Sequence, residues 1–171
     1  PKDALKISSI EEDYKVSAHY FFLVDTDFYN ISSKKNKIIL QQLIKQGHNI
    51  GLHYNPLNPS TSIKNNENNA KIQIELLENI IQRKVRFISF HRPDNKFLKL
   101  NKKFCNRLHT YMPRFFQQMG YISDSGGVWK YGIPTKNKFF LKEKAFQLLI
   151  HPEWWRFKTI TNRNKVLKFL I

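Results

Sequence analysis

The sequence has little cysteine and no long apolar segment. Cys105 is the only cysteine among 171 residues, so an internal disulfide or a zinc site built from several cysteines is excluded. No apolar run approaches the roughly 18 residues that a membrane-spanning helix needs, and no signal-peptide pattern opens the chain. This composition suits a reducing compartment, and we expect a cytoplasmic location without a transmembrane segment.

Several motifs of nucleotide and ester chemistry are also missing. The chain has no phosphate-binding loop and no G-x-G-x-x-G, so nucleotide chemistry is not supported. Because G-x-S-x-G is absent as well, Ser125 in DSGG is not a nucleophile-elbow serine. No repeat and no long Pro/Gly/Ser linker divides the chain, and its length suits one compact core. We therefore predict a single domain over residues 1–171.

Acidic residues are scarce, because 13 Asp and Glu face 29 Lys and Arg and leave a net charge of +16. The excess is uneven: residues 1–33 carry 3 basic and 6 acidic groups, or −3, and the remaining residues carry 26 and 7, or +19. A basic surface can attract nucleic acid or acidic glycans. Most of the excess is lysine scattered beside asparagine rather than clustered arginine, so we predict no specific nucleic-acid partner.

Hydrophobic periodicity divides the chain into alternating segments, and aromatic residues make up 14% of it. We expect helices over 2–14, 34–46, 67–82, 104–118 and 160–171. We expect strands over 16–24, 48–54, 85–90, 121–125 and 146–152. Pro113 should kink or divide the fourth helix, and the polar stretch 55–70 should form an extended surface loop.

This alternation of strands and helices is typical of an α/β fold with a parallel sheet. The strand cores YFFLV, RFISF and FQLLI are nearly continuous apolar runs, which indicates strands that are covered on both faces. A β/α barrel and a doubly wound sheet both fit the pattern.

Four polar residues, His53, His91, Asp124 and His151, each end a different apolar strand. The carboxyl ends of parallel strands carry the active site in barrels and open sheets, because the connecting loops converge there. Imidazole is the commonest protein metal ligand near neutral pH. A lone strand-end histidine is more often a capping or hydrogen-bonding group, but the coincidence of four such ends favours a shared site.

Other side chains leave two interpretations open. Asp25 and Asp27, in VDTDFYN after the first strand, are either turn residues or substrate contacts. Trp129 and Trp154 could stack on sugar rings or close the core, where large aromatic side chains usually lie. His19 and His48 are expected to be structural, and His109 is expected to be a surface or packing residue of a helix.

Five segments together resemble the polysaccharide deacetylase superfamily, which includes chitin and peptidoglycan deacetylases: AHYFFLVDTDFYN, GHNIGLHYNP, ISFHRP, YISDSGGVW and LLIHPEWW. They run in the family's order over about residues 1–155, and they are most similar to the branch found among bacterial surface-polysaccharide genes. The resemblance implies a distorted (β/α) barrel. It also implies a divalent metal, usually zinc, that serves hydrolysis of acetyl groups from a carbohydrate substrate.

The resemblance assigns roles to individual residues. His53 matches the first metal-binding histidine of the family's second motif. The second histidine of that motif falls at Leu57, and His91 is the candidate replacement. Arg92 matches the arginine that orients an acidic catalytic group. Asp124 and Trp129 fall in the region of the fourth motif, and His151 matches the general acid of the last.

The family's first motif, two aspartates on the first strand, has no match, because the opening PKDALKISSIEEDYKV resembles the helix that follows it. We therefore expect a barrel that lacks its first strand, with its base and carboxylate ligand missing. Such a chain should bind metal weakly and hydrolyse slowly. Two functions stay open: a metal-dependent deacetylase of carbohydrates, and a non-catalytic carbohydrate-binding or scaffolding domain on the same fold.

Overall fold

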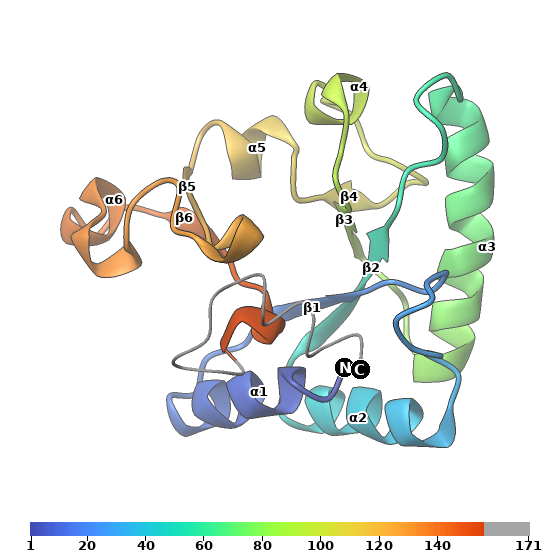
Figure 1. Cartoon of the computed structure of the whole chain (residues 1–171), viewed down its shortest axis with the longest axis horizontal. Coiled ribbons are helices and arrows are strands. Elements are labelled where there is room, and N and C mark those ends of the chain that lie inside the picture. The colour runs from blue at the N-terminus through green and yellow to red at the C-terminus, as the bar shows by residue number, and fades with distance from the viewer. Residues whose placement is uncertain (156–171) are drawn as a thin grey trace. The chain divides into compact units, whose positions relative to one another are not determined.

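The computed structural model describes residues 1–155, and these form two compact units that meet in the sequence at Met112 and Pro113. This division does not test the sequence-based prediction of a single domain over residues 1–171, which stays a prediction. Each unit is built from parallel strands joined by helices, as Figure 1 shows for the chain as a whole. The helix expected over 160–171 lies outside the described residues.

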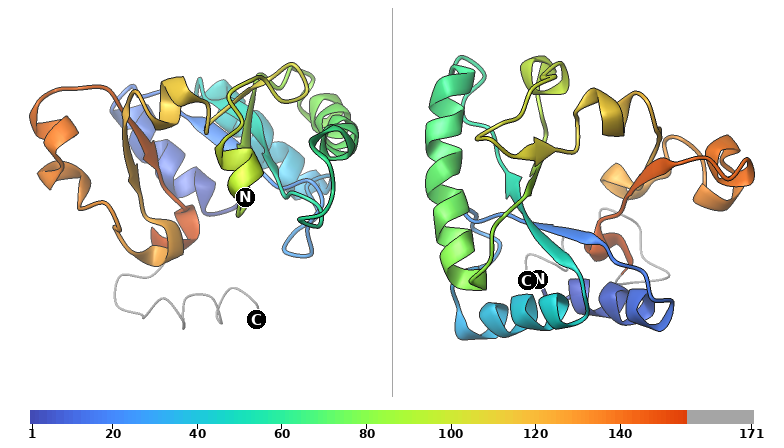
Figure 2. Two further views of the ribbon diagram at one scale, coloured as in Figure 1. Left: turned by 90° about the horizontal axis from the view of Figure 1, so that it is seen from above. Right: turned by 180° about the vertical axis from the view of Figure 1, so that it is seen from behind.

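The first unit is a four-stranded parallel sheet in the order β1-β2-β3-β4, with helices between the strands. Its elements are α1 (Ala4–Asp13), β1 (His19–Phe22), α2 (Lys34–Lys45), β2 (Asn49–Tyr54), α3 (Ile63–Ile81), β3 (Phe87–Phe90), α4 (Asn95–Leu98) and β4 (Leu108–His109). Both α2 and α3 pack against β2 and against each other, and Figure 2 gives two further views of them. The sequence-based prediction of parallel strands is confirmed.

Serine caps fix where the two long helices begin. The Ser33 side chain accepts a hydrogen bond from Asn36 N (3.3 Å), and α2 starts at the next residue, as predicted. Ser62 caps α3 in the same way through Asn65 N (3.2 Å), so α3 begins four residues before the predicted start at Glu67. The polar stretch predicted as a loop is therefore partly helical.

The sheet is tightest where β2 passes its neighbours at Gly51. A Cβ atom there would lie 2.6 Å from the Phe21 ring and 2.8 Å from the Phe87 carbonyl oxygen, so only glycine fits. Leu52, Tyr54 and the neighbouring strand β3 are buried. This packing holds the carboxyl ends of β2 and β3 side by side.

The predicted helix over 104–118 is wrong for most of its length. Cys105 and Asn106 have φ of +50° and +57° and make a turn, which is closed by hydrogen bonds between Phe104 and Arg107. The short strand β4 then pairs with β3, and only Pro113–Phe116 is helical. Burial of large side chains against the sheet has outweighed the helical spacing here, since Phe104 and its neighbour β4 join the core.

The second unit, as far as residue 155, is a parallel pair of strands with short helical turns around it. Its elements are α5 (Pro113–Phe116), β5 (Gly120–Ser123), η1 (Ser125–Gly127), η2 (Pro134–Lys136), α6 (Lys138–Leu141), β6 (Phe146–Leu149) and η3 (Pro152–Trp155). Gly120 pairs with Phe146 and Ser123 with Leu149, so both strands end at the same edge. The described strands form two separate sheets, and a closed barrel remains a prediction.

Candidate functional site

His53 and His91 come together at the carboxyl edge of the first unit's sheet. His53 is the last residue but one of β2 and pairs in register with Ser89 of β3, so His91 follows just beyond that strand. The His91 amide donates to the Tyr54 carbonyl (2.7 Å). His53 Nε2 and His91 Nδ1 are 3.2 Å apart, with the ring planes at 83°. The register of β2 and β3 therefore brings together the two imidazoles that the sequence analysis proposed as metal ligands.

Hydrogen bonding fixes the tautomer of His53. Its Nδ1 lies 3.3 Å from the Ser89 carbonyl oxygen, which can only accept, so Nδ1 carries the hydrogen. The lone pair is then on Nε2, which accepts from His91 Nδ1. Metal-binding histidines commonly use a backbone carbonyl in this way, because it orients the ring and leaves the other nitrogen bare.

The metal implied by the resemblance fits this pair only in part. Two nitrogens on one tetrahedral zinc lie about 3.3 Å apart, close to the separation of the two rings. A catalytic zinc needs three protein ligands, and within residues 1–155 no group of three His, Cys, Asp or Glu side chains could hold a metal. Cys105 does not add one, because burial raises the pKa of its thiol to about 11 and only thiolates bind metal well.

Asp124 is a buried polar side chain of the second unit, with 3% of its surface exposed. It follows β5, and its amide donates to the Leu149 carbonyl of β6 (3.3 Å). Its carboxylate accepts from the His151 amide (3.0 and 3.1 Å), from His151 Nδ1 (2.7 Å) and from Trp155 Nε1 (2.9 Å). Three donors thus hold one buried carboxylate at the end of the strand pair.

His151 follows β6 directly and forms an ion pair with Asp124 when it is protonated. Burial alone would lower the pKa of its imidazole. The hydrogen bond and the charge of Asp124, with the charge of Glu153, outweigh burial and raise the pKa above its ordinary value. Because Nδ1 is held by the carboxylate, Nε2 is the nitrogen left to meet a ligand.

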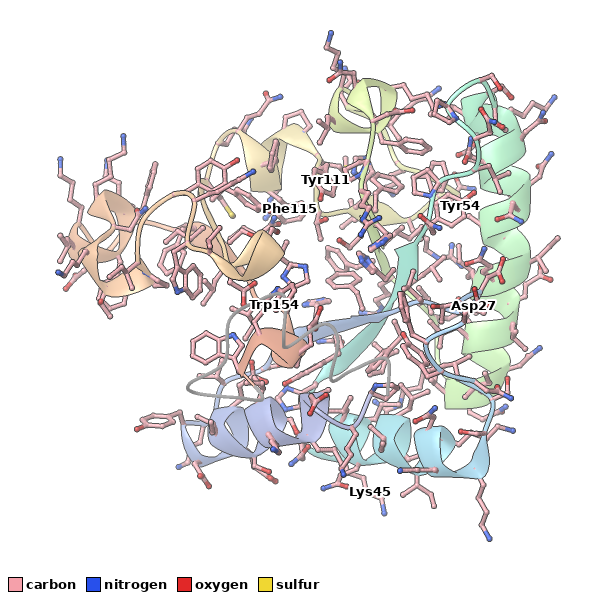
Figure 3. All side chains as sticks on the ribbon, in the orientation of Figure 1. Asp27, Lys45, Tyr54, Tyr111, Phe115 and Trp154 are labelled. Atoms are coloured by element: carbon pink, nitrogen blue, oxygen red, sulfur yellow. The ribbon has the colours of Figure 1, made fainter. Side chains whose placement is uncertain are left out.

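Trp155 is a site residue that the sequence analysis missed. Its indole N–H bonds to Asp124, its ring meets Trp129 edge-on at 6.2 Å between centroids, and 54% of its surface is exposed. The WW pair in LLIHPEWW was the available signal, but spacing could not tell which indole faces Asp124. Trp154 lies on η3, where Figure 3 labels it, and its backbone N–H donates to the His151 carbonyl (3.0 Å).

The remaining predicted site residues are placed more loosely. Arg92 is exposed and has φ of +47°, which agrees with a turn rather than a helix before Pro93. Asp27 is exposed on the segment between β1 and α2, where Figure 3 labels it. Their catalytic and substrate-binding roles, like that of Trp129, stay predictions.

Two of the other histidines, His48 and His109, make structural contacts. His48 is buried and its Nδ1 accepts from the Ala18 amide (3.2 Å). His109 is fully buried and bonds the Lys102 carbonyl through Nε2 (3.0 Å), although it lies in β4 and not in a helix. Burial lowers the pKa of His109 despite that hydrogen bond.

The predicted four-residue constellation is therefore observed as two pairs, His53 with His91 in the first unit and Asp124 with His151 in the second. The sequence-based expectation that all four share one face stays a prediction. Among the described residues, every helix is too short or too polar to cross a lipid bilayer.

Comparison with known proteins identifies the fold. No protein-family model and no curated protein matches the chain. Solved structures of BA3943 from Bacillus anthracis, a CE4 family pseudoenzyme, do match. The wild-type structure has a TM-score of 0.55 and 14% identity, over 99% of this chain and 56% of that chain.

Two mutants of the same pseudoenzyme match equally well. One has a TM-score of 0.56 and 15% identity, over 99% of this chain and 57% of that chain. The other, a mutant with restored enzymatic activity, has a TM-score of 0.55 and 14% identity, over 99% and 58%. This chain spans little more than half the length of those proteins. The likeness shows an α/β fold with parallel strands similar to that of this CE4 family pseudoenzyme.

Proposed function

We propose that this chain is a CE4-type domain of a carbohydrate deacetylase, of the branch associated with bacterial surface polysaccharides, in which His151 acts as general acid. The observation that carries the proposal is the Asp124–His151 pair at the carboxyl edge of β5 and β6. A buried carboxylate that holds a partly exposed imidazole is an arrangement suited to proton transfer. The similar fold of a CE4 family pseudoenzyme supports a CE4-type domain and says nothing of the acid role.

In this proposal the imidazolium of His151 delivers a proton from Nε2 to the departing amine or alcohol. Asp124 keeps Nδ1 protonated and raises the pKa, so a larger fraction of His151 carries the proton near neutral pH. General acids of this kind accelerate such steps by roughly 100- to 10,000-fold. Trp155 fixes the second carboxylate oxygen and keeps the carboxylate oriented toward the ring.

The proposed cofactor is a divalent metal, zinc before others because imidazole suits it, with His53 and His91 as two of its ligands. When bound, such a metal would supply an activated water and polarise the acetyl carbonyl. The two histidines contribute a fixed tautomer at His53 and a spacing suited to a shared ion. Arg92 is proposed to orient an acidic group, and Asp27, Trp129 and Trp154 to contact the sugar.

A second candidate is a non-catalytic carbohydrate-binding domain on the same fold. It is favoured by the absence of a three-ligand cluster in residues 1–155 and by the fold's likeness to a protein described as a pseudoenzyme. On this hypothesis the exposed Trp155 and its neighbour Trp129 would stack on a sugar ring without hydrolysis.

Acetate release from N-acetylglucosamine oligomers, with and without added zinc, tests the first candidate. The wild-type chain should release acetate slowly, because it has no match to the family's base and carboxylate ligand, and His151→Gln should lower that rate at least a hundredfold with little change in zinc affinity. His19→Ala is the matched control, because His19 is exposed and lies outside both pairs. Equal rates for His151→Gln and wild type would remove His151 from the acid role.

Zinc titration by calorimetry separates the two candidates. His53→Ala should abolish any zinc heat that the wild-type chain shows, whereas His19→Ala should keep it. Saturable binding of sugar oligomers without zinc binding or acetate release would instead support the non-catalytic domain. Trp155→Ala should then weaken sugar binding, because it removes the exposed ring.

A further inference from the structure

Half of the chain's net charge lies in one short part of the first unit. Residues 83–107 contain nine basic residues and one acidic residue, a net charge of +8 out of +16. Four of the chain's seven arginines are among them: Arg83, Arg86, Arg107 and Arg92, the last of which follows His91. The lysine excess elsewhere is scattered, so this concentration of arginine is a local feature.

Four of these basic side chains line a cavity of about 380 Å³ at the amino ends of β3 and β4. Lys84 and Arg86 precede β3, while Lys103 and Arg107 come from the segment that leads into β4. Asn106 also lines it. We call this cavity the basic pocket.

Glu78, near the end of α3, arranges part of the basic pocket. Its carboxylate accepts from Lys84 Nζ (3.0 Å), from the Val85 amide (2.9 Å) and from Arg107 Nη2 (3.3 Å). Burial would raise the pKa of Glu78, but these three donors and the charge of Lys84 lower it overall. One carboxylate thus holds two cations beside the cavity before any ligand arrives.

The other two cations have no such partner. Among residues 1–155, no carboxylate lies within ion-pair distance of Arg86 or Lys103, and both are exposed. The four positive charges and the one negative charge of Glu78 leave a net charge of about +3 around one small cavity. Guanidinium groups bind phosphate and carboxylate oxygens through two parallel hydrogen bonds, which favours an oxyanion here.

The basic pocket is separate from the histidine pair. Arg86 precedes β3 and His91 follows it, so five residues of extended chain, about 16 Å, lie between the two positions. The pocket therefore lies at the opposite edge of the sheet from His53 and His91, and a ligand bound there would not reach them.

We propose that the basic pocket binds an oxyanionic group, a phosphate or a carboxylate, carried on a saccharide. The cavity is of a size for one sugar residue and its charged group rather than for a duplex. The oxyanion site lies at the other edge of the sheet and needs neither metal nor His151, whereas the saccharide that carries the oxyanion rests on the proposed carbohydrate function.

Inorganic pyrophosphate is the first probe, with the amide signals of the full chain followed by NMR at low salt. We expect saturable shifts at residues of the basic pocket, and at least tenfold weaker binding in Arg86→Gln/Lys103→Gln. Both side chains are exposed, so the double variant should fold. The matched control is Lys6→Gln/Lys64→Gln, which removes the same charge from exposed sites on α1 and α3.

Equal losses in the two double variants, or shifts spread over all the lysine-rich surfaces, would overturn the proposal, because the binding would then follow net charge alone. Glucuronate and glucose 6-phosphate distinguish the carboxylate from the phosphate source, with glucose as the neutral control. Duplex DNA that binds with a steep salt dependence, while neither saccharide binds, would also contradict it.

Discussion

The two units are stabilised by different forces. Among the described residues, every buried hydrophobic side chain except Ile122 belongs to the first unit, whose helices and sheet enclose a continuous apolar core. The second unit instead centres on a buried carboxylate with three donors around it. A large apolar core tolerates polar variation at its edges, whereas a polar cluster depends on each of its members.

The two histidine sites differ in the same respect. His151 faces a carboxylate that raises its pKa, which suits an acid. His53 faces a backbone carbonyl and a second imidazole, which leaves a lone pair suited to a metal. A histidine near the end of a strand thus differs in its chemistry between the two units, because a different group faces its ring in each.

Substitution in the apolar core should have the largest effect. Leu77→Ala, on the fully buried face of α3, should lower the free energy of unfolding by about 3 kcal/mol, through lost burial and a new cavity. Leu76→Ala is the adjacent control, 43% exposed, and should cost less than about 1 kcal/mol. Urea denaturation measures both. Similar values for the two variants would break the distinction between core and surface on α3.

Asp124→Asn tests the polar cluster and should cost about 2 kcal/mol, because the amide group places a donor against other donors. The His151 pKa should fall, since burial is then opposed only by the charge of Glu153. NMR titration of the His151 ring protons measures this change. An unchanged His151 pKa would mean that Asp124 does not set it.

The same pair predicts how stability depends on pH. Because folding raises the His151 pKa, the pair's contribution is fully present below about pH 6.5 and is lost as the pH rises through the folded value. The stability difference between wild type and Asp124→Asn should therefore be larger at about pH 5.5 than at about pH 8.5. A difference that grows with pH would contradict the ion pair.

Trp155→Phe removes one of the three donors to Asp124 and keeps an aromatic ring at the position. Because the residue is half exposed, we expect a loss of only about 1 kcal/mol. The His151 pKa should rise, since Asp124 then keeps more of its negative charge for the imidazole. Trp129→Phe is the control: it alters the ring contact with Trp155 but none of the hydrogen bonds described to Asp124, and should leave that pKa unchanged.

The smallest effect is expected at a helix cap. Ser62→Ala should cost about 0.5–1 kcal/mol, because Asn65 N loses its acceptor at the start of α3. Ser60→Ala, in the exposed turn just before it, should change stability by less than about 0.5 kcal/mol. Thermal unfolding of the two variants side by side measures the difference.

Local sequence determined much of this molecule. Apolar spacing predicted α2 almost to the residue, over 34–46 against the observed Lys34–Lys45, because such spacing acts within one or two turns. The apolar runs before His53, His91, Asp124 and His151 predicted parallel strands and placed those side chains at the strand ends.

Tertiary structure decided the rest, because the outcome depended on partners distant in sequence. The apolar spacing of 104–118 was compatible with a helix, but Glu67, 38 residues away, binds the Cys105 amide and helps hold the turn that leads into β4. Likewise, only the folded chain brings Trp155 to Asp124, across 31 residues. Spacing along a chain fixes which residues face the same side of one element, whereas packing between elements fixes which side chains share a proton.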